Sequence, residues 1–257
     1  MRPGAHHSRH PRKPPAGRWL GGDPRGPPPL HRVRCHKPTV SDARGTDEIF
    51  ARIACRYDRI NRILSLGQER RWRQTAIRHL PQGTVLDLGS GTGDAAEQLA
   101  PRRVVALDPV VEMLELSHIP QRVAAVGEAL PFPDDSFDSV FSAYVVRNLA
   151  SVPKTLSEIH RVLKPGGVAA IVDLSRPTNR WLATLHRVGS AVVLPLVGAV
   201  LARSPREYWY LHRSLDSLPA PEVLYADSPL SLEKTWRMGP MGFVYWVVLT
   251  KSGTSRV

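Results

Sequence analysis

Long apolar runs and cysteine are both scarce in this sequence. No segment reaches the roughly 18 to 20 continuous apolar residues of a membrane-spanning helix, and the N-terminal stretch lacks the apolar core of a secretory signal. The 257 residues include two cysteines, Cys35 and Cys55, which are too few for a disulfide framework or a metal-ligand cluster. We therefore expect a cytoplasmic protein of a reducing compartment. Peripheral contact at the inner face of the membrane stays open.

Acidic residues are scarce in one place, the first 40 residues. That segment holds nine Lys and Arg against one acid, Asp23, so 26 basic and 22 acidic residues remain for the rest of a chain whose formal net charge is +12. This near balance argues against a nucleic-acid partner, which would need a basic stripe on the folded part. Residues 1–42 also contain nine prolines, so we expect a disordered tail. An electrostatic tether to anionic lipid is the functional alternative.

An apolar run followed by alternating glycines organises the rest of the chain. Residues 85–88, which include Asp87, predict a buried parallel strand, and a helix is expected from Ala95 onward. In the turn between them, only residues without Cβ let backbone N–H groups approach a ligand closely. The turn contains Gly89, Gly91, Thr92 and Gly93. This arrangement predicts a nucleotide-type pocket at the N-terminus of the helix.

The spacing of the glycines indicates which nucleotide binds. A dinucleotide fingerprint has the pattern Gly-x-Gly-x-x-Gly, but here the third glycine comes one position early and Asp94 would repel a diphosphate. A second strand, residues 103–107, leads into Asp108, an acid placed to accept hydrogen bonds from ribose hydroxyls. We therefore expect S-adenosylmethionine (SAM), which has a cationic amino-acid end and no phosphate, and we expect no metal. A dinucleotide, or a glycine turn that binds nothing, remains an alternative.

Strands and helices alternate after the glycine turn. Strands are expected at 123–126, 139–143 and 168–174, with helices at 111–116 and 154–163. Two strand-like runs, 231–238 and 243–250, follow near the C-terminus and are joined by a short turn. The pattern predicts an α/β fold with a doubly wound, mostly parallel seven-stranded sheet and a C-terminal antiparallel hairpin.

Three further segments flank this sheet in the sequence. Helices over 49–66 and 69–80 either fold over the crevice as a lid or pack on the sheet as an ordinary helical pair. The almost uncharged stretch 188–202, with Pro195 in its middle, predicts two helical pieces. These pieces either pack inside the domain or receive an apolar substrate tail. A helix is also expected over 207–215.

Several separated motifs resemble one family. They are Tyr57-Asp58-Arg59-Ile60-Asn61, Leu64-Ser65-Leu66-Gly67, Trp72-Arg73, the strand and glycine turn over 85–94, Glu128-Ala129-Leu130-Pro131-Phe132, Arg147-Asn148-Leu149, Leu163-Lys164-Pro165-Gly166-Gly167 and Tyr208-Trp209-Tyr210-Leu211. Together they resemble the class I SAM-dependent C-methyltransferases of menaquinone and ubiquinone biosynthesis, from about Ile49 to Lys251. The resemblance implies a Rossmann-like methyltransferase domain over 83–251, preceded by a lid over 43–82 and the tail over 1–42, and followed by a tail over 252–257.

The resemblance also implies roles for individual residues. The expected cofactor-binding residues are Asp87, Gly89, Gly91, Thr92, Gly93, Asp108, and Val126 and Gly127 at the end of the third strand. Arg147 and Asn148 occupy the catalytic position after the fourth strand. The residues expected to close over the substrate from the lid are Tyr57, Asp58 and Asn61.

The implied activity is C-methylation of a reduced prenylated quinone, demethylmenaquinol or a related benzoquinol, in respiratory quinone biosynthesis. Arg147 would act by stabilising a phenolate, because a guanidinium stays protonated and is a poor base. A helix-entry cap with a surface arginine is the alternative for this pair. Because Val126 and Ala143 stand where the family usually carries polar residues, a methyltransferase of another small apolar acceptor and a non-catalytic SAM-binding protein stay open. The expected partner is a lipophilic quinol and not a nucleic acid, with a homodimer left open.

Overall fold

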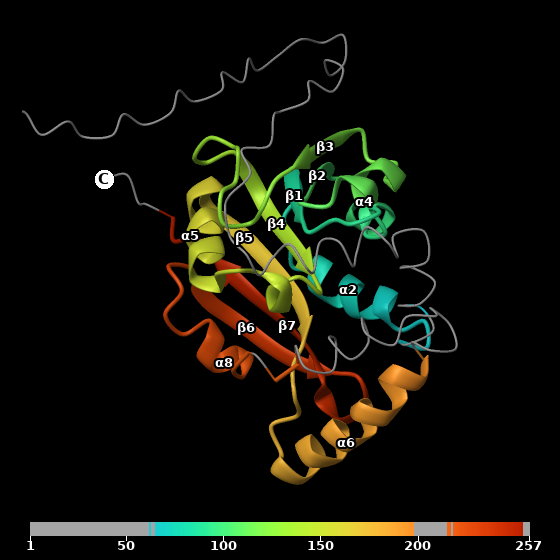
Figure 1. Cartoon of the computed structure of the whole chain (residues 1–257). Helices are drawn as coiled ribbons and strands as arrows, with labels where there is room; N and C mark the ends of the chain where they lie inside the picture. The colour runs from blue at the N-terminus through green and yellow to red at the C-terminus, as the bar shows by residue number, and fades with distance from the viewer. Residues whose placement is uncertain (1–61, 63–64, 198–214, 217, 254–257) are drawn as a thin grey trace, which may run out of the picture. The chain divides into compact units, whose positions relative to one another are not determined.

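A seven-stranded sheet forms the centre of the computed structural model (Figure 1). Its strands are β1 (Thr84–Leu88), β2 (Arg103–Asp108), β3 (Gln121–Ala124), β4 (Phe137–Ala143), β5 (Leu163–Leu174), β6 (Ser231–Met238) and β7 (Val244–Thr250). They lie in the order β3-β2-β1-β4-β5-β7-β6; β1 to β5 are parallel, and β7 is antiparallel to both of its neighbours. The structure describes residues 62, 65–197, 215–216 and 218–253, with the backbone alone for 193–197, and all of them belong to the unit Arg32–Val257.

Helices cover both faces of the sheet, because side chains along each strand alternate between the two faces. Val85, Phe141 and Val172 pack with Trp72 of α2 (Glu69–Ile77), on the face that also receives α3 (Ala96–Leu99). Leu86, Val140 and Ile171 pack with Ile159 of α5 (Val152–Val162) on the opposite face. The other helical segments are α4 (Val111–Leu116), η1 (Val146–Asn148), α6 (Arg180–Val197), α8 (Pro221–Leu224) and η3 (Pro240–Gly242). The result is a three-layer α/β/α arrangement.

The position of α5 follows from its sequence. Ser151 caps its N-terminus by accepting a hydrogen bond from the Lys154 N–H at 3.4 Å, and Pro153 in the first turn needs no partner there. Its buried residues recur at helical spacing and face β4 and β5: Val152, Thr155, Leu156, Ile159 and Val162. The N-terminus of α5 therefore lies near the carboxyl ends of the parallel strands.

The strand order defines where a ligand can bind. From β1 the chain proceeds outward to β2 and β3, and it then returns to place β4 on the other side of β1. In open α/β sheets such a reversal creates a crevice outside the carboxyl ends of the two strands. The loop after β1 and the loop after β4 border this crevice, and these loops carry the glycine turn and the Arg147-Asn148 pair.

The predicted fold class is confirmed, including the antiparallel β6–β7 hairpin. Several strand boundaries differ by one or two residues from the sequence-based expectation, and the differences at the end of β3 and the start of β5 bear on the site and on the sheet. Strand β3 ends at Ala124 instead of 126, so Val126 and Gly127 lie in the loop beyond it. Strand β5 begins at Leu163, because the chain stays extended through the Lys-Pro-Gly-Gly turn and pairs with β4 across a register shift between Phe137 and Ser139.

Helix α6 also differs from the prediction. It begins at Arg180 and continues through Gly189 and Pro195 to Val197, so no break occurs in the described part of the stretch expected to form two helical pieces; residues 198–202 lie outside the described residues. A glycine inside an exposed helix costs only about 1 kcal/mol relative to alanine, which other helix-forming residues offset. Among the described parts of the chain, no helix is both long and apolar enough to cross a membrane. The helix expected over 207–215, and most of the one over 49–66, lie outside the described residues.

Candidate functional site

The glycine loop after β1 is packed so closely that only glycine fits at two of its positions. Gly89 and Gly93 have φ angles of +71° and +83°, in the left-handed region that other residues rarely adopt. A Cβ at Gly89 would collide with the side chain of Val145, in the loop after β4, and a Cβ at Gly93 would collide with Ser117 Oγ. At Gly89 the loop after β1 is therefore in direct contact with the loop after β4.

Backbone donors in this loop are already used within the protein. The N–H groups of Gly89 and Ser90 donate to the Leu107 carbonyl at 2.7 and 3.0 Å, and that of Gly93 donates to the Ser90 carbonyl at 2.9 Å. The Gly91 N–H donates to Asp108 Oδ2 at 2.9 Å. A phosphate cradle needs such groups to point at the ligand. The loop geometry therefore supports a ligand without phosphates over a dinucleotide.

Asp108 is fixed at the carboxyl end of β2, where sequence reasoning placed it. Its Oδ1 accepts a hydrogen bond from the Val110 N–H at 2.9 Å, and its backbone carbonyl accepts one from the Ala125 N–H at 3.3 Å. The second contact brings the start of the Val126-Gly127 loop beside Asp108. Gly127 in turn packs on α5, since a Cβ there would lie 3.0 Å from Thr155 Cγ2. Asp108, Val126 and Gly127 thus border one end of the crevice.

Asp87 is a buried carboxyl with an unused acceptor. It lies within β1, and its Oδ2 has no hydrogen-bond partner among the described residues. Burial raises the pKa of Asp87 to about 7; the positive charge of Arg73 opposes this rise, and the charges of Asp108 and Asp94 add to it. The buried hydroxyl of Ser90 also lacks a partner within the described chain. An orphaned carboxylate oxygen beside the glycine loop suits a cationic ligand group.

Arg73 of α2 neutralises the acid of the glycine loop. Its buried guanidinium forms an ion pair with Asp94 and donates from Nε to Gln98 Oε1 at 3.1 Å. The motif Trp72-Arg73 was noted in the sequence without a role for either residue. The structure shows that Trp72 packs in the core while Arg73 joins α2 to the loop.

Arg147 is held by a buried carboxylate that sequence reasoning missed. Its Nη1 donates to Asp173 Oδ1 at 2.7 Å, and the Val146 N–H donates to Asp173 Oδ2 at 2.7 Å. Asp173 lies fully buried at the carboxyl end of β5, and the Arg147 side chain is 8% exposed. The alternative of a surface arginine at a helix cap is therefore wrong. The Asn148 N–H donates to the Val145 carbonyl at 2.8 Å and closes the short turn.

Tyr144 is a second residue that the sequence did not single out. It follows β4 with a φ angle of +65°, and its N–H donates to the Val172 carbonyl at 2.7 Å. The buried hydroxyl has no hydrogen-bond partner in the part of the chain that is described, and burial raises its pKa. Its unusual backbone conformation gives no signal in the sequence, because tyrosine rarely adopts it.

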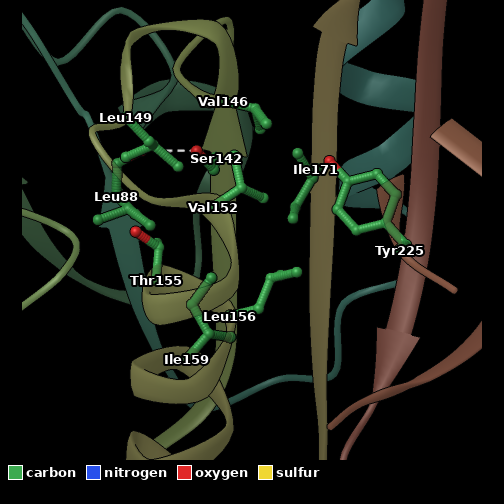
Figure 2. Close-up of a pocket in the computed structure, with 10 residues that line it drawn as sticks. All are labelled: Leu88, Ser142, Val146, Leu149, Val152, Thr155, Leu156, Ile159, Ile171 and Tyr225. Carbon is green, nitrogen blue, oxygen red and sulfur yellow. Dashed lines mark hydrogen bonds between the residues drawn. The ribbon is translucent and has the colours of Figure 1, made fainter. Parts of the chain in front are cut away.

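A small apolar cavity lies beside the crevice, between α5 and the sheet (Figure 2). Its lining residues are Leu88, Ser142, Val146, Leu149, Val152, Thr155, Leu156, Ile159, Ile171 and Tyr225. None of these side chains is charged, and Ser142 donates its hydroxyl to the Leu88 carbonyl at 2.9 Å. The cavity therefore belongs to the core beneath the site and not to the polar crevice itself.

The structure brings together most of the predicted site. The predicted residues that lie at the carboxyl ends of the parallel strands, or in the loops just after them, are Asp87, Gly89, Gly91, Thr92, Gly93, Asp108, Val126, Gly127, Arg147 and Asn148. The three predicted lid residues, Tyr57, Asp58 and Asn61, lie outside the described residues, so their role stays a prediction. The arrangement offers two buried acids at the ends of β1 and β2, and a guanidinium anchored by Asp173 in the loop after β4.

Comparison with known families shows which family this chain belongs to. A family model described as the ubiE/COQ5 methyltransferase family matches residues 38–226, which is more than half of the chain. The chain belongs to the ubiE/COQ5 methyltransferase family. As a member of this family, it is an enzyme, a SAM-dependent methyltransferase. The family and enzyme class that the motifs predicted are thereby confirmed.

Relatives within the ubiE/COQ5 family are similar over most of their length. The demethylmenaquinone methyltransferase of Symbiobacterium thermophilum is 38% identical over 202 residues, which cover 69% of this chain and 80% of the relative. The ubiquinone/menaquinone biosynthesis C-methyltransferase UbiE of Syntrophotalea carbinolica is 39% identical over 191 residues, which cover 68% of this chain and 80% of the relative.

Solved structures agree on the fold of this family member. A SAM-dependent methyltransferase from Thermotoga maritima aligns with a TM-score of 0.52 at 19% identity, covering 80% of this chain and 99% of that one. The PH0226 protein of Pyrococcus horikoshii aligns with a TM-score of 0.53 at 16% identity, covering 76% and 98%. These likenesses concern the fold, and the roles of individual residues in the site remain predictions.

Proposed function

We propose that this ubiE/COQ5 family member transfers a methyl group from SAM to a ring carbon of a reduced prenylated quinone, with demethylmenaquinol as the reference acceptor. The Symbiobacterium and Syntrophotalea relatives carry demethylmenaquinone, ubiquinone and menaquinone in their names. The structural observation that supports the proposal is the Arg147–Asp173 ion pair, in which a buried carboxylate holds the guanidinium in the loop after β4. Such a cation suits an acceptor that becomes anionic during the reaction.

The proposed SAM site uses the acidic end of the crevice. The unpartnered Oδ2 of Asp87 would receive the cationic amino-acid end, and Asp108 would accept hydrogen bonds from the ribose. A carboxylate has about four acceptor positions, so the backbone hydrogen bonds that fix Asp108 are compatible with this role. Thr92, Val126 and Gly127 would line the remainder of the site. When bound, SAM supplies a methyl group already activated by its sulfonium.

Arg147 would activate the acceptor by charge. Removing the phenolic proton of a quinol pushes electron density onto the adjacent ring carbon, and a guanidinium beside that oxygen stabilises the anion. Arg147 stays protonated at working pH, so it acts as an electrostatic group and not as a base. Asp173 is then a positioning residue, because its carboxylate holds Arg147 in one orientation and lies itself at the end of β5. Asn148 would contribute a side-chain amide to the same oxygen.

The remaining assignments complete the proposal. Of the lid expected over 43–82, α2 packs on the sheet as an ordinary helix, and the residues before it would close over the substrate with Tyr57, Asp58 and Asn61 and exclude water. The methyltransferase domain proper would span 83–251, and the basic tail over 1–42 would take no part in the chemistry. A lipophilic acceptor also implies access from a membrane surface, and a homodimer is compatible with each of these residue roles.

The test is methyl transfer from labelled SAM to extracted membrane quinones, with demethylmenaquinol as the reference. We expect label in the reduced acceptor and none in the oxidised quinone, because only the reduced ring can form a phenolate. Equal labelling of both forms contradicts the phenolate mechanism. Tight SAM binding without labelling of any quinol would contradict the proposed substrate class and leave the family membership intact.

A further inference from the structure

Helix α6 carries an apolar stripe that no described part of the chain covers. The stripe consists of Trp181, Leu185, Val188 and Val192, whose side chains are between 57% and 85% exposed. At 100° per residue, positions 181, 185, 188 and 192 fall within about 60° of one another around the helix axis. Of the two alternatives for the stretch 188–202, packing inside the domain is therefore wrong for Val188 and Val192, and the wall for a substrate tail stays open.

The opposite side of α6 is fixed to the protein. Arg176 Nη1 donates to Ser190 Oγ at 2.9 Å and lies 3.1 Å from His186 Nδ1, and the His186 ring stacks on Phe243 with ring centroids 5.2 Å apart. Arg187 forms an ion pair with Asp216 at 3.0 Å. Rotation of α6 to bury its stripe would break these contacts, so the fixed side of the helix keeps the stripe facing outward.

Charge and composition indicate what the stripe contacts. The sequence of α6 contains Arg180 and Arg187 and no acid, and Arg180 is exposed beside Trp181 at the start of the helix. Arg187 is paired with Asp216 on the fixed side, so Arg180 is the cation beside the stripe. A helix with an apolar stripe, a tryptophan and an exposed arginine at its edge is typical of segments that lie in the interface plane of a membrane. The helix is not long and apolar enough to cross one. Anionic lipid headgroups would complement its positive charge.

We propose that α6 docks the enzyme on an anionic membrane surface, with the stripe in the boundary between headgroups and acyl chains. The proposal rests on the proposed function, because it gives the lipophilic quinol a route to the crevice. Asp173 lies near the end of β5, and α6 begins six residues after that strand ends. Figure 1 shows α6 beyond the carboxyl end of β5. Docking through α6 therefore brings the edge of the sheet that carries Arg147 close to the lipid.

The test is co-sedimentation of the full chain with vesicles of phosphatidylcholine alone or with about 30% phosphatidylglycerol, in the absence of SAM and quinol. We expect Leu185→Glu to weaken binding about tenfold or more, since burial of a leucine side chain contributes at least this much. The matched control is Val223→Glu in α8, because Val223 and Leu185 are 64% and 62% exposed. Both variants keep the basic N-terminal tail, so the tail cannot account for a difference between them.

Charge dependence is tested separately. Arg180→Ala should weaken binding about fivefold on the anionic vesicles and leave binding to phosphatidylcholine unchanged. Equal binding of Leu185→Glu and Val223→Glu would overturn the proposal, as would failure of the wild-type chain to bind anionic vesicles. Loss of a dimer in sedimentation velocity for Leu185→Glu without lipid would also overturn it, and would assign the stripe to a contact between two copies.

Activity separates this proposal from the proposed function. Leu185→Glu should methylate a short-chain, water-soluble quinol at the wild-type rate and lose activity on quinol embedded in vesicles. If the wild-type chain methylates no quinol but binds vesicles through Leu185, the function fails and the docking surface stands. If the wild-type chain and Leu185→Glu methylate the soluble and the embedded quinol at the same rates, the proposed function stands and the docking surface is wrong.

Discussion

Replacing the buried carboxyl of β1 by an amide, Asp87→Asn, should change how stability depends on pH. Asp87 titrates near pH 7 in the folded protein instead of near 3.8. Because the folded pKa is raised, the stabilising proton is fully bound below the unfolded pKa and is lost as pH rises through 7. A pKa difference of about three units at about 1.36 kcal/mol per unit amounts to about 4 kcal/mol.

The variant has no proton to lose at this position, so its stability relative to wild type should rise with pH. Between pH 5 and 7 the difference should grow by about 1.4 kcal/mol per pH unit and then level off above pH 7. Urea unfolding at unit steps from pH 5 to 8, without SAM, measures this difference in unfolding free energy. Tryptophan fluorescence follows the unfolding, because Trp72 is buried in the folded protein. Asp227→Asn, which removes an exposed acid, controls for the change in net charge. A difference that stays constant from pH 5 to 8 would refute the argument.

The same titration should appear in SAM binding. If the cationic end of SAM lies beside Asp87, binding favours the ionised carboxyl and releases its proton. The ratio of the variant's dissociation constant to that of wild type should then rise between pH 6 and 8, with a limit of tenfold per pH unit. Isothermal titration calorimetry of both proteins gives this ratio. A ratio that is independent of pH would place the cationic group elsewhere.

Three further perturbations test the other parts of the site. Arg147→Ala should lower turnover about a hundredfold or more while SAM affinity stays nearly unchanged, and equal loss of both in steady-state and binding assays would contradict its role toward the acceptor. Asp173→Asn leaves the buried Arg147 without its carboxylate and should cost about 3–5 kcal/mol in urea unfolding; a loss below about 1 kcal/mol would show that the pair is not buried in solution. Gly89→Ala adds a Cβ against Val145 and should destabilise the protein and abolish SAM binding. The control is Gly166→Ala, because Gly166 has a φ angle of +75° but open space around it. This control should lower the free energy of unfolding by about 1–2 kcal/mol and leave SAM binding intact. Similar effects of the two glycine variants would contradict the close packing of the loop.

The crevice could be predicted because its main parts follow directly from single strands. Asp87, the glycines and Asp108 lie in or just after apolar runs that read as parallel strands, and parallel strands bring their carboxyl ends to one edge. The position of Asp108 could therefore be predicted from the apolar run before it and from the rule that parallel strands end at one edge of the sheet. Strand β3 ends at Ala124, two residues earlier than predicted, so Val126 and Gly127 lie in a loop. They still follow the carboxyl end of β3, at the same edge of the sheet.

Asp173 and Arg73 could not be predicted in the same way. The contact between Arg147 and Asp173 joins the ends of β4 and β5 across 26 residues of sequence, and it depends on the rotamer of a long side chain. Arg73 faces Asp94 because α2 packs over the glycine loop, which its own sequence does not specify. In both cases a charged residue near an apolar run was visible, but its partner was set by tertiary packing.

Helix α6 shows a different limit of sequence reasoning. Its uncharged stretch left two alternatives, packing inside the domain and a wall for a substrate tail, and only the first is contradicted. The described part of α6 instead turns a continuous apolar stripe to solvent, because Arg176, His186 and Asp216 hold its polar side. Composition alone does not distinguish an apolar face that packs inward from one that is kept outward.

The order of strands in the sheet also bears on how the chain is made. Strand β7 lies between β5 and β6, and β6 pairs with β7 and with no other strand of the described sheet. At a synthesis rate of about 5–20 residues per second, the seventy residues from Leu174 to Val244 take roughly 4–14 s to emerge. During that time the apolar edge of β5 has no strand beside it, and an open edge of this kind pairs readily with other chains. A holding chaperone that covers this edge during expression should therefore raise the yield of folded protein.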